Sequence, residues 1–326
     1  MNKISSLFSI LILKHRRLLH HFFNLVSNFS YRYRRDEKLS SLKVKMNLYF
    51  YFHPKLKRNY LNELKFIQEK SATNFPYSFV FPYNFIYTYS ITDIKVLKDI
   101  EKDLLYVIHR GKRLYFKRSM KTELAVQIAY YCLLIEQDEQ SPHRYLDNDF
   151  TIDQNNIVLD VGAAEGIMGL DNIEKISKLY IFEVNNEWIE ALNATFEPWK
   201  EKVFVVNKYV SNIDDNKTIT LDHFFGEDKI DFIKIDVEGA EMSIFEGSTQ
   251  ILHRDAIKIA VCTYHKQEDA EKIEQVLLKN KFMCSFTPNY MLFIFEDMKP
   301  PYFRKALLRA KKNKMHNGNN TISLLG

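Results

Sequence analysis

The stretch VLDVGAAEG, at residues 158–166, decides the fold of this 326-residue chain. It completes a short run of apolar and β-branched side chains from Ile157 to Val161, a pattern typical of a buried strand. Gly162 follows at once, and glycine permits the tight turn by which a strand enters a helix. The stretch therefore predicts a strand, a turn and a helix, the unit from which open α/β sheets are built.

The same alternation continues towards the end of the chain. The predicted strands are 157–161, 179–182, 203–206, 232–235, 257–262, 282–286 and 291–295, and the predicted helices are 165–177, 186–197, 240–246 and 267–280. Alternation of strands and helices indicates a doubly wound, mostly parallel sheet. Because only a short connection separates the final two strands, the last one is predicted to be antiparallel.

Upstream of this region the patterns differ. Aromatic residues occupy every odd position from Phe75 to Tyr89, which predicts one face of an edge strand or extended arm that packs on the domain. Stacking of these rings on sugars or bases is the alternative. A hairpin is predicted over 104–117 and a helix over 121–136. Residues 4–27 have the pattern of an amphipathic helix, packed on the body or lying in a membrane interface.

The loop after the first strand lacks the GxGxxG pattern of dinucleotide-binding folds. Asp160 lies two residues before Gly162, and Gly166 lies four residues after it. Glu165, beside the helix start, would repel a pyrophosphate but tolerate a cation. Glu183 ends the second strand, where a carboxylate can accept hydrogen bonds from both hydroxyls of a ribose. This combination favours a ribose-bearing cation such as S-adenosylmethionine.

A second informative stretch is DFIKIDVEGAE, at residues 231–241. Together with residues 158–166, Phe182-Glu183 and TLDHFF at 220–225, it resembles the FkbM-type methyltransferase family. Members of that family are S-adenosylmethionine-dependent O-methyltransferases that often act on hydroxyls of sugars or natural products. The resemblance covers about 155–296. It implies an α/β, Rossmann-like class I methyltransferase fold with a seven-stranded, mostly parallel sheet and an antiparallel last strand, here preceded by an α+β extension.

The resemblance also implies a set of cofactor-binding positions. They are Asp160, Gly162, Ala163, Gly166, Glu183, Val184 and Asp236. Ala164 stands where many members have asparagine, so a polar side chain is missing near the methionine part of the cofactor. Contacts from the backbone should survive this change, and we therefore expect the protein to be active.

Methyl transfer to a hydroxyl requires an aligned acceptor and a base that takes its proton. His265, at the end of the fifth predicted strand, is the expected base, although a merely hydrogen-bonded histidine is the alternative. Asp236 and Glu238 are alternate bases or acceptor-orienting groups. Lys234 shares a strand face with Asp236. Two interpretations of this lysine remain open, a structural ion pair with Asp160 or Asp236 and a role in positioning the substrate.

No metal site is predicted from the spacing of Cys132, Cys262 and Cys284, which form no CxxC motif. Asp236, Glu238 and His265 are able to hold Mg²⁺ through oxygen, so dependence on a divalent metal is left open. His143 is expected on a surface loop, with a lid over the cofactor as the alternative. A chain with only three cysteines is typical of a protein in a reducing compartment.

Charge is concentrated at the two ends of the chain. Residues 1–45 carry a net charge of +8 and residues 298–326 carry +7, whereas the whole chain carries +5, so the body between them is at −10. An enzyme acting on nucleic acid would more often have its positive charge around the active site. The last basic segment is expected to be a solvated tail, or a short amphipathic helix from Phe303 to Lys312 that contacts anionic lipid or a phosphorylated substrate carrier.

The sequence therefore predicts an enzyme of four segments. They are a basic helical segment at 1–45, an aromatic-rich accessory or substrate region at 46–150, a methyltransferase domain at 151–298 and a basic tail at 299–326. The expected activity is methylation of a hydroxyl on a glycan or small natural product in the cytoplasm, with peripheral membrane contact through the basic ends as an option. The alternatives are a methyltransferase of RNA or another macromolecule, and a degenerate domain that binds cofactor or partner without turnover.

Overall fold

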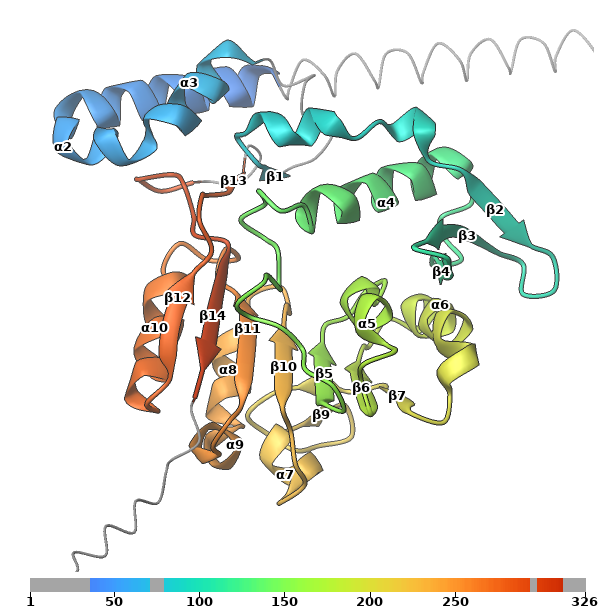
Figure 1. Cartoon of the computed structure of the whole chain (residues 1–326). Helices are drawn as coiled ribbons and strands as arrows, with labels where there is room; N and C mark the ends of the chain where they lie inside the picture. Colours follow the sequence, from blue (N-terminus) through green and yellow to red (C-terminus); the bar gives the residue numbers. More distant parts are fainter. Residues whose placement is uncertain (1–35, 71–78, 294–297, 313–326) are drawn as a thin grey trace, which may run out of the picture. The chain divides into compact units, whose positions relative to one another are not determined.

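The computed structural model describes residues 36–70, 79–293 and 298–312. The chain divides into two compact units, which are considered separately below (Figure 1). The smaller unit comprises Met1–Tyr83 with Met291–Phe303, and the larger comprises Asn84–Tyr290 with Arg304–Gly326. All of the residues proposed above for the cofactor and for catalysis belong to the larger unit.

The larger unit is built on a seven-stranded sheet with the order β12-β14-β11-β10-β5-β6-β7. Its strands are β5 (Ile157–Val161), β6 (Lys178–Phe182), β7 (Val203–Val206), β10 (Phe232–Ile235), β11 (Lys258–Cys262), β12 (Met283–Phe286) and β14 (Leu307–Lys311). Strands β7, β6, β5, β10 and β11 are paired in parallel, and β14 is antiparallel to both of its neighbours. The predicted doubly wound sheet with an antiparallel last strand is therefore confirmed.

The last strand comes from a later part of the chain than predicted. Residues 291–295 were expected to supply it, but Leu292–Phe293 form β13, which pairs with β1 (Phe79–Val80) in the smaller unit. Strand β14, red in Figure 1, instead lies between β11 and β12. The expectation of a solvated tail or a helix over 303–312 is wrong for Leu307–Lys311.

Burial explains why these basic residues form a strand. Leu307, Leu308 and Ala310 are completely buried, so the segment contributes to the core on both faces of the sheet. The guanidinium of Arg309 is also buried, and it forms an ion pair with Asp147. It donates further hydrogen bonds to the carbonyl groups of Arg144 and Tyr145. The positive charge is therefore neutralised locally, as a buried cation requires.

Helices and short elements connect the strands. They are α5 (Ile167–Asn172), α6 (Asn186–Phe196), β8 (Tyr209–Val210), β9 (Thr218–Ile219), α7 (Leu221–Phe225), α8 (Glu241–Glu246), α9 (Thr249–His253) and α10 (Asp269–Lys279), with a 3₁₀ turn at Glu197–Trp199. The four predicted helices are confirmed, although α5 ends several residues earlier than expected. Helix α6 begins where the side chain of Asn185 accepts hydrogen bonds from two backbone N–H groups, an arrangement that stabilises a helix start.

Before the large sheet, the same unit contains a three-stranded antiparallel sheet and one long helix. The elements are β2 (Val96–Asp99), β3 (Leu104–His109), β4 (Lys112–Tyr115) and α4 (Glu123–Glu136). The hairpin and the helix match the predictions. The edge strand or extended arm expected over 75–89 is wrong in its last part, because Asn84–Thr88 form a 3₁₀ turn. A second 3₁₀ turn follows at Ile91–Asp93. Residues 75–78 of the expected segment lie outside the described residues.

The smaller unit is mostly helical. Residues 36–52 form a helix, followed by α2 (Pro54–Lys57), a 3₁₀ turn at Arg58–Tyr60 and α3 (Leu61–Glu69). The ring of Tyr60 stacks on Phe303 at a centroid distance of 5.1 Å, so the two parts of this unit share a core. The helix expected at 4–27 lies outside the described residues. Within the part that is described, no helix has the length and apolar character to cross a membrane.

The position of β14 makes a testable prediction. Leu308→Ala should lower the free energy of unfolding by about 2–5 kcal/mol, because it truncates a fully buried side chain on a strand inside the sheet. Leu278→Ala is the matched control on the exposed face of α10, and it should change stability by less than about 0.5 kcal/mol. Urea unfolding of both variants measures the difference. Equal stability of the two would contradict the buried strand.

Candidate active site

Acidic side chains gather at the carboxyl ends of three neighbouring strands. Asp160 lies on β5, Glu183 directly follows β6, and Asp236 directly follows β10. Parallel strands present their carboxyl ends at one edge of the sheet, where open α/β folds bind their ligands. The structure therefore brings together residues that the sequence places far apart.

The turn after β5 runs tightly against the end of β10. Gly162 has a φ angle of +74°, and a β-carbon at this position would lie only 2.0 Å from the carbonyl oxygen of Asp236. The backbone N–H of Asp236 donates to Val161 at 3.0 Å, and that of Gly162 donates to Phe182 at 2.9 Å. Three strand ends are thus joined by backbone contacts that leave no space for a side chain at residue 162.

Glu183 fixes the loop on its other side. One carboxylate oxygen accepts a hydrogen bond from the backbone N–H of Ala164 at 3.1 Å. The other oxygen accepts from the N–H groups of Val184 and Asn185, at 2.8 and 2.9 Å. The oxygen that accepts from Ala164 has one lone pair left, so the group is still able to accept one hydrogen bond from a ligand.

Lys234 is a buried cation paired with Asp160. Its Nζ atom lies 3.0 Å from Asp160 Oδ1 and donates a hydrogen bond to the carbonyl oxygen of Gly162. Burial would lower the pKa of the lysine, but the charges of Asp160 and Asp236 outweigh it and raise the pKa. The structure therefore contains the ion pair, with Asp160 as its partner, and the role of Lys234 in positioning the substrate stays a prediction. The same lysine also holds the turn in place.

Four side chains surround the carboxylate of Asp236. Tyr145 donates its hydroxyl hydrogen to Oδ2 at 2.9 Å, and Tyr264 donates to Oδ1 at 3.2 Å. His143 Nε2 lies 3.6 Å from Oδ2, and His265 Nε2 lies 3.5 Å from Oδ1. The carboxylate therefore connects the segment before the sheet with the ends of β10 and β11.

These neighbours keep Asp236 ionised. Burial alone would raise the pKa of its carboxyl group, but hydrogen bonding to His143 and the positive charge of Lys234 hold the pKa well below its usual value. Two further glutamates belong to this network: Glu136 interacts electrostatically with Asp236, and Glu165 interacts with Glu136 and Lys234. Burial raises the pKa of both Glu136, at the end of α4, and Glu165, in the turn after β5, to about 7.

His265 is oriented by a carboxylate that the sequence analysis did not assign. Its Nδ1 atom lies 2.7 Å from Oε1 of Glu241, a residue that is 1% exposed. The opposite ring nitrogen lies between Asp236 and Glu238, 3.7 Å from the Glu238 carboxylate. Glu238 itself is largely exposed and has a φ angle of +56°. Arg304 donates to the carbonyl groups of Tyr264 and His265, which fixes the loop after β11.

One expectation about this region is wrong. His143 was expected on a surface loop, but its side chain is 2% exposed and lies beside Asp236. The segment that carries it is held down by a hydrogen bond from Thr287 to the carbonyl of Pro142 and by the bonds from Arg309. Such contacts join residues more than a hundred positions apart, so no local pattern could have revealed them.

The comparisons with known proteins agree with this geometry. Residues 145–295 match the family model described as the methyltransferase FkbM domain. This part of the chain is an FkbM methyltransferase domain. The predicted resemblance is confirmed over that range, and methyltransferases of the FkbM family use S-adenosylmethionine. Ala164 has a left-handed φ angle of +46°, a conformation that asparagine adopts more readily than alanine.

Solved structures that resemble the chain include several methyltransferases. An FkbM methyltransferase from Methylobacillus flagellatus is 16% identical with a TM-score of 0.41, and the match covers 58% of this chain and 54% of that one. Trm5b from Pyrococcus abyssi is 14% identical with a TM-score of 0.38, and the match covers 64% of this chain and 56% of that one. A precorrin-6Y C5,15-methyltransferase from Geobacter metallireducens is 11% identical with a TM-score of 0.36, and the match covers 50% of this chain and 82% of that one. The chain thus spans about half of the M. flagellatus structure. No curated protein matches it.

The structural role of Lys234 can be tested by removing its charge. Lys234→Met should lower the free energy of unfolding by about 3–5 kcal/mol, because it leaves the buried carboxylate of Asp160 without a partner. Lys272→Met, which breaks an exposed pair with Glu268, should cost less than about 1 kcal/mol. Denaturant unfolding compares the two variants. If Lys234→Met unfolds like its control, the lysine is not a structural cation.

Proposed function

We propose that the protein transfers the methyl group of S-adenosylmethionine to a hydroxyl group of a sugar, a glycan or a small natural product. The observation that carries this proposal is His265, whose Nδ1 is held by Glu241 while Nε2 faces the carboxylates of Asp236 and Glu238. A hydroxyl acceptor loses a proton when it is methylated, and an imidazole in this arrangement is able to accept it.

The cofactor fits the edge formed by β5, β6 and β10. In this proposal the residues that hold it are Asp160, Gly162, Ala163, Gly166, Glu183, Val184 and Asp236. Gly162 allows the turn after β5 to lie against Asp236, and the Glu183 oxygen that accepts from Ala164 keeps one lone pair for a ribose hydroxyl. The sulfonium carries a positive charge, and the carboxylates at this edge favour a cation.

The transfer itself is a displacement at carbon. The acceptor oxygen attacks the methyl carbon, the carbon–sulfur bond breaks, and its electron pair neutralises the sulfonium. The proton of the hydroxyl group passes to Nε2 of His265. Glu241 holds the ring in the tautomer that leaves Nε2 free to accept it. Glu238, whose side chain is 93% exposed, is placed to orient an acceptor that enters from solvent.

Binding of the cofactor tests the first half of the proposal. At a concentration about 100 times its Kd, S-adenosylmethionine should stabilise the wild-type protein by about 2.7 kcal/mol, seen as a thermal shift. Glu183→Ala should weaken binding about tenfold or more, since hydrogen bonds to a charged group contribute about 1.5–3 kcal/mol. Glu201→Ala, on an exposed residue, should bind like wild type. Absence of any shift in the wild-type protein would refute the cofactor assignment.

Turnover tests the second half. His265→Ala should reduce the rate of methyl transfer by about 10²–10⁴-fold, the usual contribution of a general base, while the Kd for S-adenosylmethionine stays unchanged. His253→Ala, on the exposed end of α9, is the control and should retain the wild-type rate. Formation of S-adenosylhomocysteine is followed with panels of sugars, glycans, small alcohols and RNA.

Two outcomes separate the parts of this proposal. Full activity of His265→Ala would remove the histidine as base but leave the methyltransferase assignment intact. Methylation of RNA in that panel, with no sugar or small alcohol accepted, would overturn the proposed acceptor class. The net charge of −10 on residues 46–297 supports the small acceptor, since nucleic acid is repelled by an acidic surface.

A further inference from the structure

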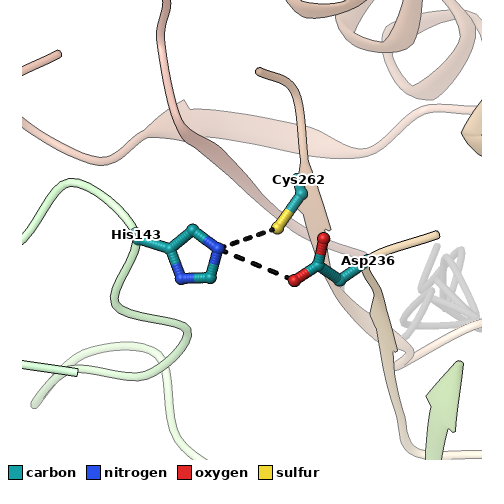
Figure 2. A group of neighbouring side chains, drawn as sticks. All are labelled: His143, Asp236 and Cys262. Atoms are coloured by element: carbon teal, nitrogen blue, oxygen red, sulfur yellow. Dashed lines mark hydrogen bonds and ion pairs between the residues drawn. The ribbon is translucent and has the colours of Figure 1, made fainter. Parts of the chain in front are cut away.

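Three side chains with different ligand atoms meet beside the proposed active site. His143 comes from the segment before the large sheet, Asp236 from the end of β10 and Cys262 from the end of β11 (Figure 2). The Nε2 atom of His143 lies 3.6 Å from Cys262 Sγ and 3.6 Å from Asp236 Oδ2. All three ligand atoms lie within 4.8 Å of one another.

The two distances from His143 are close to those between ligands of a single ion. With bonds of about 2.3 Å to sulfur and about 2.0 Å to nitrogen or oxygen, two ligands at the tetrahedral angle lie about 3.3–3.6 Å apart. The two distances from His143 are at the upper end of that range. An ion can therefore enter between the three atoms with only small movements of the side chains.

The positions of the three side chains are fixed by their surroundings. Cys262 is completely buried and His143 is 2% exposed, so neither is a surface side chain free to turn away. The polar atoms described around the His143 ring, in Asp236, Cys262 and Tyr264, all lie near Nε2. The opposite nitrogen, Nδ1, is buried and has no hydrogen-bond partner among the residues that the structure describes. The ring nitrogen with polar neighbours is therefore Nε2, which faces the sulfur of Cys262 and the carboxylate of Asp236.

The donor set selects a class of ion. A thiolate is a poor ligand for Mg²⁺ and Ca²⁺, which take oxygen ligands. Nitrogen, sulfur and one carboxylate together suit Zn²⁺ or a transition metal of similar softness. The other two ligand atoms would be a carboxylate oxygen of Asp236 and Nε2 of His143, which binds a metal only when it carries no proton. Binding releases the proton of the Cys262 thiol to solvent, since only the thiolate is a ligand.

We propose that His143, Asp236 and Cys262 bind one divalent transition-metal ion of the zinc class. Three protein ligands leave a fourth position open, as in metal sites that take part in chemistry rather than only in folding. The hydroxyl group of Tyr264 lies beside that position, 3.3 Å from His143 Nε2 and 3.2 Å from Asp236 Oδ1. The ion would lie next to His265, where it would add positive charge close to the proposed base.

The test is metal uptake by the full-length protein, free of any polyhistidine tag. The chain is stripped with a chelator, titrated with Zn²⁺ and, separately, with Co²⁺, and its metal content is measured by mass spectrometry. One Zn²⁺ per chain is expected. The Co²⁺ form should show the intense near-ultraviolet absorption of a thiolate bound to cobalt.

Matched variants identify the ligands. Cys262→Ser should abolish the cobalt–thiolate absorption and weaken Zn²⁺ binding by at least about tenfold, and His143→Ala should also weaken it at least about tenfold. Cys284→Ser and His253→Ala change a cysteine and a histidine outside the cluster and should bind like wild type. Circular dichroism confirms that each variant is folded.

Either of two results overturns the proposal. The first is that wild-type protein takes up less than a tenth of an equivalent of Zn²⁺ and of Co²⁺. The second is that folded Cys262→Ser binds both ions like wild type. Because metal uptake is measured without S-adenosylmethionine or an acceptor, neither result bears on methyl transfer, and loss of methyl transfer would not affect this test.

Discussion

A buried lysine holds the carboxyl ends of the two central strands together. Lys234 on β10 forms an ion pair with Asp160 on β5 and donates to the carbonyl group of Gly162 in the turn that follows. A lone cation in this position would be strongly unfavourable, so the lysine and the aspartate require each other. Their contact fixes the turn against Asp236, and every other part of the site is arranged around that turn.

The carboxylate of Asp236 depends on this arrangement and organises the next layer of side chains. It accepts hydrogen bonds from two tyrosines and lies within 3.6 Å of two histidines. One histidine, His265, is held from the far side by Glu241, and the other, His143, faces a cysteine. A single ionised group thus adjoins both the proposed base and the proposed metal ligands, and the low local polarity strengthens its interactions with each.

Local pattern was enough to predict the parallel strands, their helices and the residues of the glycine turn. It was enough because hydrophobic periodicity and the spacing of Asp160, Gly162 and Glu183 are properties of short segments. Strand β14 was missed because Arg309 and Lys311 give it a basic character, and only contacts with distant residues show that Arg309 is buried. His143 was missed for the same reason. The pairing of Glu241 with His265 likewise depends on how two loops approach each other.

The place of β14 in the sheet has a consequence for the order in which the protein is made. Strand β12 is paired only with β14 in the large sheet, and β14 is formed by residues 307–311. During synthesis, β12 must therefore wait for a segment that leaves the ribosome more than twenty residues later. Until then the outer edge of β11 is unpaired and its apolar side chains are uncovered, a state prone to aggregation. The sheet can close on this side only once residues 307–311 have left the ribosome.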